Sequence, residues 1–203
     1  MNLKNFKAAS SKDQMLKEVS ELLKLATQQH SYNIAYQTKV LEDIQLTNAM
    51  QTENLANIAG AQRLKAAGEK YGALIAQMKS DATEFNAQYK ASYYLICANY
   101  PSEIPAFDKS FNESIKNQNA MYAVEAELAV QLQKLGDILI TGYKNQQVKY
   151  DPSQKTLLFV NDNLMNSYNA SVGKVADLAK QEDEITRRYI ANLSKYEKPA
   201  SSK

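Results

Sequence analysis

Apolar residues recur at steps of three and four along most of the chain, the spacing that gathers them on one face of an α-helix. The clearest stripe lies in the second quarter of the sequence and consists of Leu64, Ala67, Tyr71, Leu74, Met78, Phe85, Tyr89 and Leu95. Alternating steps of three and four indicate a helix that packs an apolar strip against another helix. The whole pattern predicts four helices of similar length, over residues 12–57, 60–98, 106–145 and 156–197.

Residues that turn the chain are scarce, with six Gly and four Pro among 203 residues. An all-β sandwich would need a turn signal about every 8–12 residues, so the sequence excludes that class. Helices of about 40 residues would be about 60 Å long, and short connections between them suit an up-and-down arrangement. The expected fold is therefore all-α, an elongated antiparallel bundle of three to four long helices.

The predicted helices are separated by breaks of unequal strength. Asn99–Pro105 is a firm break, because its two prolines lie four residues apart and the interior of a helix does not accommodate them. Gly60 is weaker, since a single glycine does not reliably end a helix. The apolar stripe also thins over Asn48–Thr52. If the chain does not turn at Gly60, one helix spans residues 12–98. The fold is then a three-helix bundle with a projecting arm, or a coiled coil that needs a partner.

The helical pattern stops near residues 147–160, where two short extended runs flank Asp-Pro-Ser-Gln, a sequence that favours a turn. One interpretation is a small β-hairpin. The other is a helix that begins at Asp151 as its N-cap, with Pro152 in the first turn. The helix is slightly favoured, because an isolated hairpin has little stability unless it packs on something.

The length of the chain fits a single domain. We expect a flexible N-terminal segment over residues 1–10, one helical-bundle domain over 11–197 and a flexible tail over 198–203. The first residues lack the apolar core of a signal peptide. No run approaches the ~20 apolar residues that cross a bilayer, so membrane insertion is not expected.

The charges are nearly balanced, with 24 basic and 22 acidic side chains. Lysines are spread along the chain among acidic residues, and the arginines are Arg63, Arg187 and Arg188. Nucleic-acid binding usually requires a concentrated basic face, often rich in arginine, so it is not expected.

Uncharged amides are unusually abundant, with 17 Asn and 16 Gln. Long cytosolic helices usually carry Glu, Lys and Arg on their surfaces, because these residues combine helix propensity with ion pairing between turns. A helical surface rich in amides and tyrosine is more typical of bacterial envelope, secreted or viral structural proteins. An extracytoplasmic location, periplasmic or secreted with the signal removed, is slightly favoured over the cytoplasm.

Residues that carry chemistry are few. His30 is the only histidine and Cys97 the only cysteine, whereas di-iron bundles need two Glu-x-x-His motifs and zinc proteases need two histidines. We therefore expect no metal, no cofactor, no catalytic residues and no enzymatic activity. Cys97 follows two apolar residues and is predicted to be a buried, unreactive thiol. Gly68 and Gly72 lack the spacing of a phosphate loop and instead predict a close approach of two helices.

The thirteen tyrosines fall into groups of different predicted roles. One group lies on the apolar stripes and is predicted to be core: Tyr71, Tyr89, Tyr122, Tyr168 and Tyr189. A second group lies off the stripes and is predicted to contact a partner: Tyr32, Tyr36, Tyr93, Tyr94 and Tyr100. Tyrosine is enriched at protein interfaces. The expected partner is another protein or a second copy of the chain.

Long amphipathic helices, an amide-rich surface and few chemical groups favour a non-enzymatic structural or interaction protein. The setting would be a bacterial envelope, a secretion or conjugation machine, or a phage particle. In architecture and composition the chain resembles the helical minor-pilin subunits of type IV secretion systems, and this resemblance implies a subunit of such an assembly. An alternative is a membrane-surface or pore-forming helical protein, which would need a basic face or an apolar hairpin.

Overall fold

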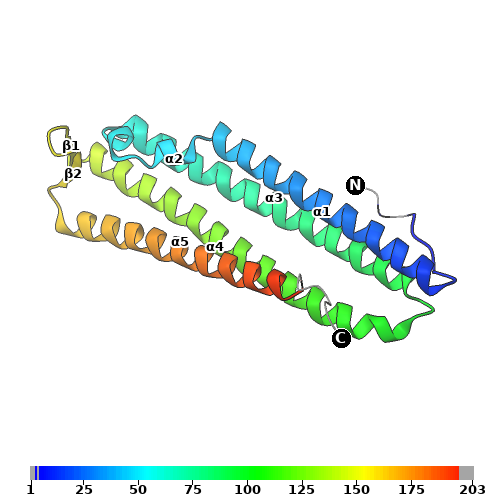
Figure 1. Cartoon of the computed structure of the whole chain (residues 1–203). Coiled ribbons are helices and arrows are strands. Elements are labelled where there is room, and N and C mark those ends of the chain that lie inside the picture. Colours follow the sequence, from blue (N-terminus) through cyan, green and yellow to red (C-terminus); the bar gives the residue numbers. More distant parts are fainter. Residues whose placement is uncertain (1–2, 4, 197–203) are drawn as a thin grey trace. The chain divides into compact units, whose positions relative to one another are not determined.

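The computed structural model describes residue 3 and residues 5–196, with side chains as far as residue 188. In this part of the chain the long helices are α1 (Lys12–Asp43), α3 (Ile58–Ile96), α4 (Ile104–Lys144) and α5 (Asp162–Tyr196) (Figure 1). The short elements are α2 (Leu46–Ala49), the 3₁₀ helices η1 (Thr52–Leu55) and η2 (Pro101–Glu103), and the strands β1 (Val148–Asp151) and β2 (Thr156–Phe159). The all-α fold with one small hairpin is confirmed.

The chain forms two compact units, to both of which α3 and α4 contribute. The first unit comprises Met1–Lys39 and Ala76–Lys116, and the second comprises Val40–Ile75 and Asn117–Lys203. The single domain expected over residues 11–197 stays a prediction. The predicted flexible tail, residues 198–203, lies outside the described residues, as do residues 1, 2 and 4.

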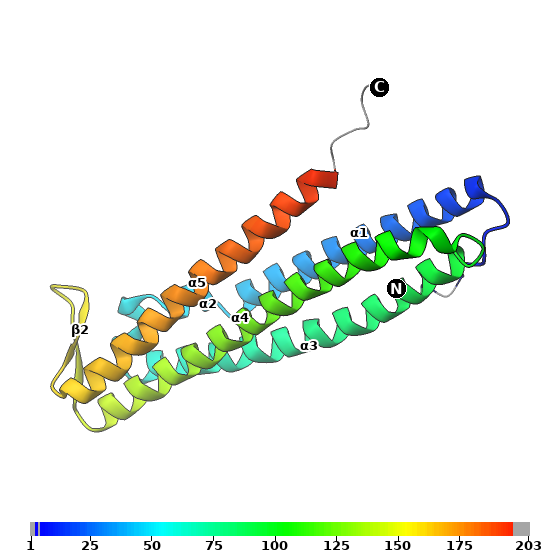
Figure 2. The same ribbon diagram turned by 90° about the horizontal axis from the view of Figure 1, so that it is seen from below.

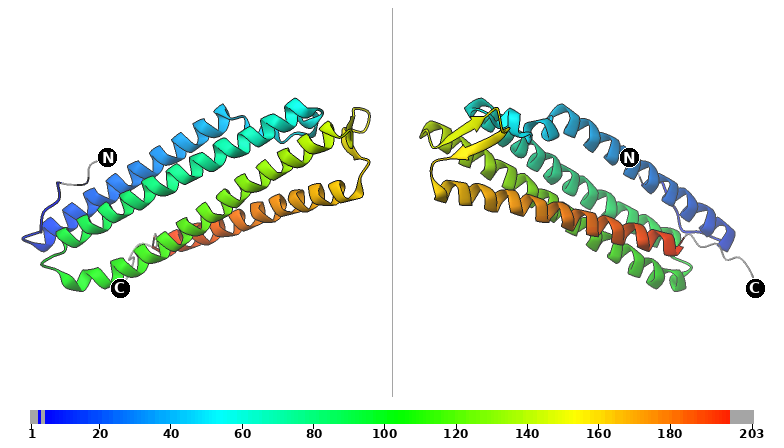
Figure 3. Two further views of the ribbon diagram at one scale, coloured as in Figure 1. Left: turned by 180° about the vertical axis from the view of Figure 1, so that it is seen from behind. Right: turned by 60° about the vertical axis from the view of Figure 1, so that its left-hand side comes forward.

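The core of the first unit joins α1 to the C-terminal half of α3, which run side by side (Figures 1 and 3). Its buried side chains are Leu3, Ala9, Met15, Leu22, Ile96 and Cys97. The backbone N–H of Ala9 donates to the Ile96 carbonyl oxygen at 3.1 Å. The hydroxyl of Ser92 donates to the Leu3 carbonyl oxygen at 3.1 Å. The described part of the segment that we expected to be flexible, residues 1–10, is therefore anchored on α3.

The break between α3 and α4 lies where the two prolines predicted it. Pro101 begins η2, and Pro105 is the second residue of α4, where a missing N–H removes no helical hydrogen bond. Aromatic rings then pack α3 against the start of α4 within the first unit. The ring of Tyr93 stacks on that of Phe107 with centroids 3.7 Å apart, and Phe107 lies 5.3 Å from Phe111.

In the second unit α3 and α4 approach closely at small residues. A Cβ atom added at Gly68 would lie 3.0 Å from the backbone nitrogen of Gln133 and 3.1 Å from the carbonyl oxygen of Ala129. One added at Gly136 would lie 2.9 Å from the backbone nitrogen of Lys65. The predicted close approach at Gly68 is confirmed, because the backbones of α3 and α4 leave no room there for a side chain.

The first connection differs from the prediction. Helix α1 ends at Asp43 rather than at residue 57, and Gln45 follows in the left-handed region with φ of 49°. Helix α3 begins at Ile58 and runs through Gly60, whose position is so close to the Asn54 carbonyl oxygen that a side chain would clash. The chain therefore turns in its polar stretch. The alternative of one helix over residues 12–98 is wrong.

The segment that follows α4 is a hairpin, and the favoured helix start at Asp151 is wrong. Strand β1 pairs antiparallel with β2, with Val148 opposite Phe159 and Asp151 opposite Thr156 (Figure 2). The Asp151 carboxylate instead closes the turn, since its Oδ1 accepts from the backbone N–H of Ser153 at 2.8 Å. An Asx turn of this kind competes directly with helix capping.

The hairpin is stable because it does pack on other elements of the second unit. Val148 is buried, and the Phe159 ring lies 5.1 Å from that of Tyr168 on α5. The Lys155 ammonium lies 3.3 Å from the Glu53 carboxylate of η1. An isolated hairpin is unstable in water, but this one packs on α5 and η1.

Helix α5 begins after Asn161, whose Oδ1 accepts from the backbone N–H groups of Asn163 and Leu164 at 2.9 and 3.1 Å. Leu178 and Ile185 pack against Val124 of α4. The hydroxyl of buried Ser171 has no hydrogen-bond partner among the described residues.

Acidic groups also meet in the core of the second unit. Glu125 is buried, and burial followed by the charges of Glu125 and Glu182 raises the pKa of Tyr71. Burial, and then the charge of Asp183, raises the pKa of Glu182 itself. Helix α5 thus places a carboxyl group where its ionised form is disfavoured.

Replacing Gly136 and Gly173 by alanine should change stability in opposite directions. The Gly136→Ala methyl group would press on the backbone of Lys65, so we expect a loss of about 1–3 kcal/mol. At Gly173 no atom lies within 4 Å of the added Cβ, so Gly173→Ala should stabilise by about 0.5–1 kcal/mol through helix propensity. Urea unfolding of the two variants checks this pair. Equal midpoints would contradict the close α3–α4 approach.

Glu182→Gln should stabilise the protein at neutral pH. A carboxyl group whose pKa is raised by folding contributes most below its unfolded pKa of about 4.5 and loses that contribution as the pH rises through the folded value. Glutamine does not ionise, so we expect a melting temperature higher by at least about 1 °C at pH 7 and little change at about pH 3.5. Exposed Glu184→Gln is the control. A higher melting temperature at about pH 3.5 but not at pH 7 would contradict the raised pKa of Glu182.

Candidate protein-binding groove

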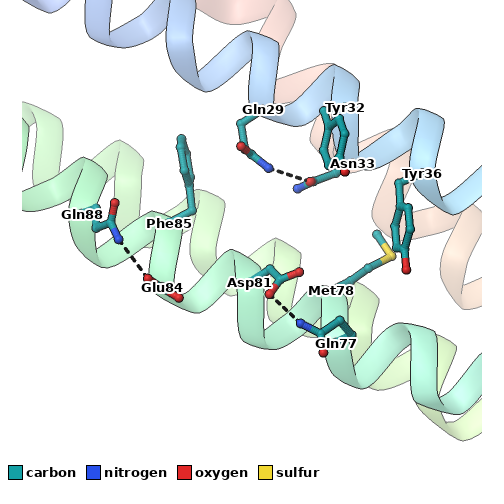
Figure 4. Close-up of a pocket in the computed structure, with 10 residues that line it drawn as sticks. All are labelled: Gln29, Tyr32, Asn33, Tyr36, Gln77, Met78, Asp81, Glu84, Phe85 and Gln88. Carbon is teal, nitrogen blue, oxygen red and sulfur yellow. Dashed lines mark hydrogen bonds between the residues drawn. The ribbon is translucent and has the colours of Figure 1, made fainter. Parts of the chain in front are cut away.

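An open cavity of about 620 Å³ lies between α1 and α3 within the first unit (Figure 4). Helix α1 contributes the side chains of Gln29, Tyr32, Asn33 and Tyr36. Helix α3 contributes those of Gln77, Met78, Asp81, Glu84, Phe85 and Gln88. We call this cavity the tyrosine groove.

The groove exists because the contact face of α1 changes character along its length. Near its start, Met15 and Leu22 are buried, and they are the buried residues of α1. Further along, Gln29 and Asn33 occupy the side that lines the groove. Amide groups lose hydration when two helices close over them, whereas leucine side chains gain from the same burial. Apolar burial therefore holds α1 on α3 near Met15 and Leu22, and the groove lies further along the two helices.

The polar side chains of the groove are hydrogen-bonded along their own helices rather than across the gap. The Gln29 amide donates to Asn33 Oδ1 at 2.9 Å on α1. On α3, Gln77 donates to Asp81 Oδ1 at 2.7 Å and Gln88 donates to Glu84 Oε1 at 3.1 Å. Each of these bonds spans four residues of one helix, as Figure 4 shows. They stiffen the two walls without drawing the walls together.

Two stacked tyrosines form the upper wall of the groove. Tyr32 and Tyr36 are 64% and 44% exposed, and their ring centroids lie 6.5 Å apart with the planes inclined by 8°. On the facing helix, the side chain of Phe85 stands in the gap and Met78 lies beside the Tyr36 ring (Figure 4). The groove therefore combines exposed aromatic surface with an apolar floor.

The charge of the groove has one sign. Asp81 and Glu84 are in the lining, and none of the ten lining residues is a lysine or an arginine. The whole chain has a formal net charge of +2. The groove is thus an acidic region on a slightly basic protein.

The structure does not bring the five predicted interface tyrosines together. Tyr32 and Tyr36 lie in the groove. Tyr93 stacks on Phe107, and Tyr100 packs against the core of the first unit. The Tyr94 hydroxyl donates to both carboxylate oxygens of Asp108, at 2.7 and 2.6 Å. The last three therefore serve packing inside the first unit, and their contact with a partner stays a prediction.

Lys90 completes a small charged site beside these aromatic rings. Its ammonium lies 3.0 Å from Asp108 Oδ1, 5.3 Å from the Tyr94 ring centroid and 5.7 Å from that of Phe111. The hydrogen bond from Tyr94, and then the one from Lys90, lowers the pKa of Asp108. One carboxylate and two rings thus hold one lysine.

Sequence reasoning missed the α3 wall of the groove. Met78 and Phe85 lie on the clearest apolar stripe, which was predicted to pack against another helix, yet both are only half-buried. The available signal was on the opposite helix, where the stretch Thr27–Asn33 replaces the apolar positions of a packing face by amides. An apolar stripe that faces such a stretch is left partly uncovered.

A cavity of about 440 Å³ in the second unit is lined by charges of both signs, Asp43, Arg63 and Lys70. His30 is exposed. Cys97 is buried, and burial raises the pKa of its thiol. Within the part that the structure describes, no group of three or more His, Cys, Asp or Glu residues is arranged to hold a metal ion. No described helix combines the length and the apolar character needed to cross a membrane.

Amide hydrogen exchange should show that α1 opens more easily along the groove than at its beginning. Residues 26–39 contribute no buried side chain, whereas residues 12–25 contain Met15 and Leu22. Segments with few buried contacts open locally at lower free energy. We expect exchange at least about tenfold faster in residues 26–39 than in residues 12–25, measured by mass spectrometry. Uniform protection along α1 would show that the groove is closed in solution.

Known proteins offer no guide to the role of this groove. No protein-family model matches the chain, no curated protein matches its sequence, and no solved structure matches its fold.

Proposed function

We propose that this chain is a non-enzymatic interaction protein and that its tyrosine groove receives a segment of a partner protein. The observation that carries this proposal is the pair of exposed, stacked rings of Tyr32 and Tyr36 on the wall of an open cavity. Tyrosine supplies a large contact area at a small cost in side-chain entropy, and it dominates many binding surfaces.

The groove also has the form that a partner would need. Hydrogen bonds from Gln77 and Gln88 hold the Asp81 and Glu84 carboxylates before binding, and Tyr32 and Tyr36 stack on each other. Preorganised surfaces lose less entropy when a complex forms. Phe85 and Met78 supply apolar area in the middle of a polar rim, which is the usual distribution at interfaces.

The setting that we propose is a bacterial envelope, secretion, conjugation or phage assembly, in which a minor-pilin-like subunit is one such role. Support comes from the amide-rich composition, with 17 Asn and 16 Gln, together with the long helices. A structural subunit needs surfaces that bind partners while staying hydrated, and amide side chains meet that need without adding charge.

A second candidate is a role at a membrane surface. Leu16, Leu23 and Ile34 are each at least half exposed, and their spacing of seven and eleven residues places them on one face of α1. An exposed apolar stripe of this kind can enter the interfacial layer of a bilayer. Flotation of the protein with anionic liposomes would support this role, and loss of flotation in Leu16→Ser/Leu23→Ser would assign it to the stripe.

Photocrosslinking in the cells that make the protein tests the proposed function. A benzoylphenylalanine at exposed Gln77, on the α3 wall, should give a discrete protein adduct. The same group at Lys180, an exposed position on α5, is the control and should not give this adduct. The double substitution Tyr32→Ala/Tyr36→Ala should lower the Gln77 adduct at least about tenfold, because interface tyrosines often contribute more than about 1 kcal/mol each.

Two results would contradict the proposal. One is the absence of any adduct at Gln77, and the other is an adduct that forms equally well without the two tyrosines. Both tyrosines are exposed and make no core contact of the first unit, so the double variant should keep the circular dichroism spectrum of the parent.

A further inference from the structure

We infer that the occupant of the tyrosine groove is a basic amphipathic helix of a partner protein. Its lysine or arginine side chains would meet Asp81, Glu84 and the tyrosine rings, and its apolar side chains would meet Phe85 and Met78. This inference rests on the proposed function and adds the chemistry of the partner.

The carboxylates of the groove are placed to receive cations. Asp81 and Glu84 are three residues apart on α3, so they lie on one side of the helix, and both are exposed. Each uses one oxygen to accept an amide hydrogen bond, from Gln77 and Gln88 respectively. The second oxygen of each carboxylate remains for a cation, and no cation of the lining is present to take it.

The first unit shows how a carboxylate and aromatic rings together hold a cation. There Lys90 is held by the Asp108 carboxylate at 3.0 Å and lies over the Tyr94 and Phe111 rings at 5.3 and 5.7 Å. The attraction of a cation to an aromatic face adds to its ion pair. The groove offers carboxylates, tyrosine faces and a phenylalanine ring, but the lysine is missing. A partner's lysine or arginine would supply the cation that these carboxylates and rings attract.

A helix fits the groove better than an extended segment does. The walls are two neighbouring helices, and no strand edge of the first unit is available among the described residues for an extended chain to pair with. A helix can instead lay one face into the space between two others and read it through side chains three, four and seven residues apart. A cavity of about 620 Å³ accepts the side chains of one such face.

Peptide binding to the purified full chain tests this inference. The probe is a fluorescein-labelled peptide of about 18 residues, or five helical turns, with leucine on one face and lysine elsewhere. Two matched peptides carry glutamine or glutamate in place of lysine. We expect the lysine peptide to bind at least about tenfold more tightly than the glutamine peptide, and the glutamate peptide to bind more weakly still.

Matched variants separate the groove from the overall charge of the protein. Asp81→Asn/Glu84→Gln keeps the side-chain shapes and removes both charges, and it should weaken the lysine peptide at least about tenfold. Glu42→Gln/Glu69→Gln removes two exposed charges elsewhere and should change binding less than about twofold. Circular dichroism checks the fold of each variant, and Asp81→Asn alone provides a milder test at the same site.

The results distinguish the partner chemistry from the proposed function. Equal losses in the two double variants would overturn the inference, because bulk charge would then explain binding. Tight binding of the glutamine peptide that depends on Tyr32 and Tyr36 would also overturn the inference of a basic partner. The proposal that a partner docks in the groove would remain. Failure of all three peptides, with the Gln77 adduct intact, would reject a basic helix but keep the function. Failure of the peptides and of the adduct would reject both.

Discussion

The second unit depends on the close approach of α3 and α4, where backbone lies on backbone at Gly68 and Gly136. Because no side chain separates the helices there, the larger residues on either side, such as Leu64, Leu132 and Leu139, can interlock and become almost completely buried. The position of α4 then determines where the hairpin and α5 pack. Val148 closes on Gly142, and Leu178 and Ile185 cover Val124. Helix α5 also places polar groups in this packing: the buried Ser171 hydroxyl has no hydrogen-bond partner among the described residues, and Glu182 is half-buried.

The helices of the first unit pack through different residues. Aromatic rings, rather than glycines, join the end of α3 to the start of α4. The chain before α1 is held on α3 by the backbone hydrogen bond from Ala9 to Ile96 and by the Ser92 hydroxyl. Helix α1 has its buried residues, Met15 and Leu22, near its beginning, and Leu25 packs against the same core. The tyrosine groove is the direct result. It opens where amides replace the leucines that would have closed it, and it leaves Phe85, Met78 and two tyrosines within reach of a partner.

Carboxylates and aromatic rings occur at two places in this unit, at Lys90 and in the groove. At Lys90 the chain itself supplies the cation for a carboxylate and two rings, and the result fastens α3 to α4. In the groove the carboxylates and rings are present without the cation. A surface that lacks one member of a set that the protein completes elsewhere is a physical reason to expect a partner that brings it. It also explains how a chain with few reactive groups could be specific.

The sequence by itself determined the helices and most of their ends. The periodicity from Leu64 to Leu95, the two prolines at Pro101 and Pro105, and the close approach at Gly68 each have a local cause, and the structure agrees with them. At Gly72 an added Cβ would make only ordinary contact, 3.4 Å from Ala129. Local patterns misplaced the first turn, because Gly60 serves close packing on Asn54 rather than chain reversal. They also favoured a helix at Asp151, since the hairpin packs on other elements, on Tyr168 of α5 and on Glu53, which lies far away in the sequence. Only the tertiary structure could separate Tyr32 and Tyr36 from Tyr93, Tyr94 and Tyr100. Whether a tyrosine is exposed depends on what the facing helix presents, and no pattern within one helix contains that information.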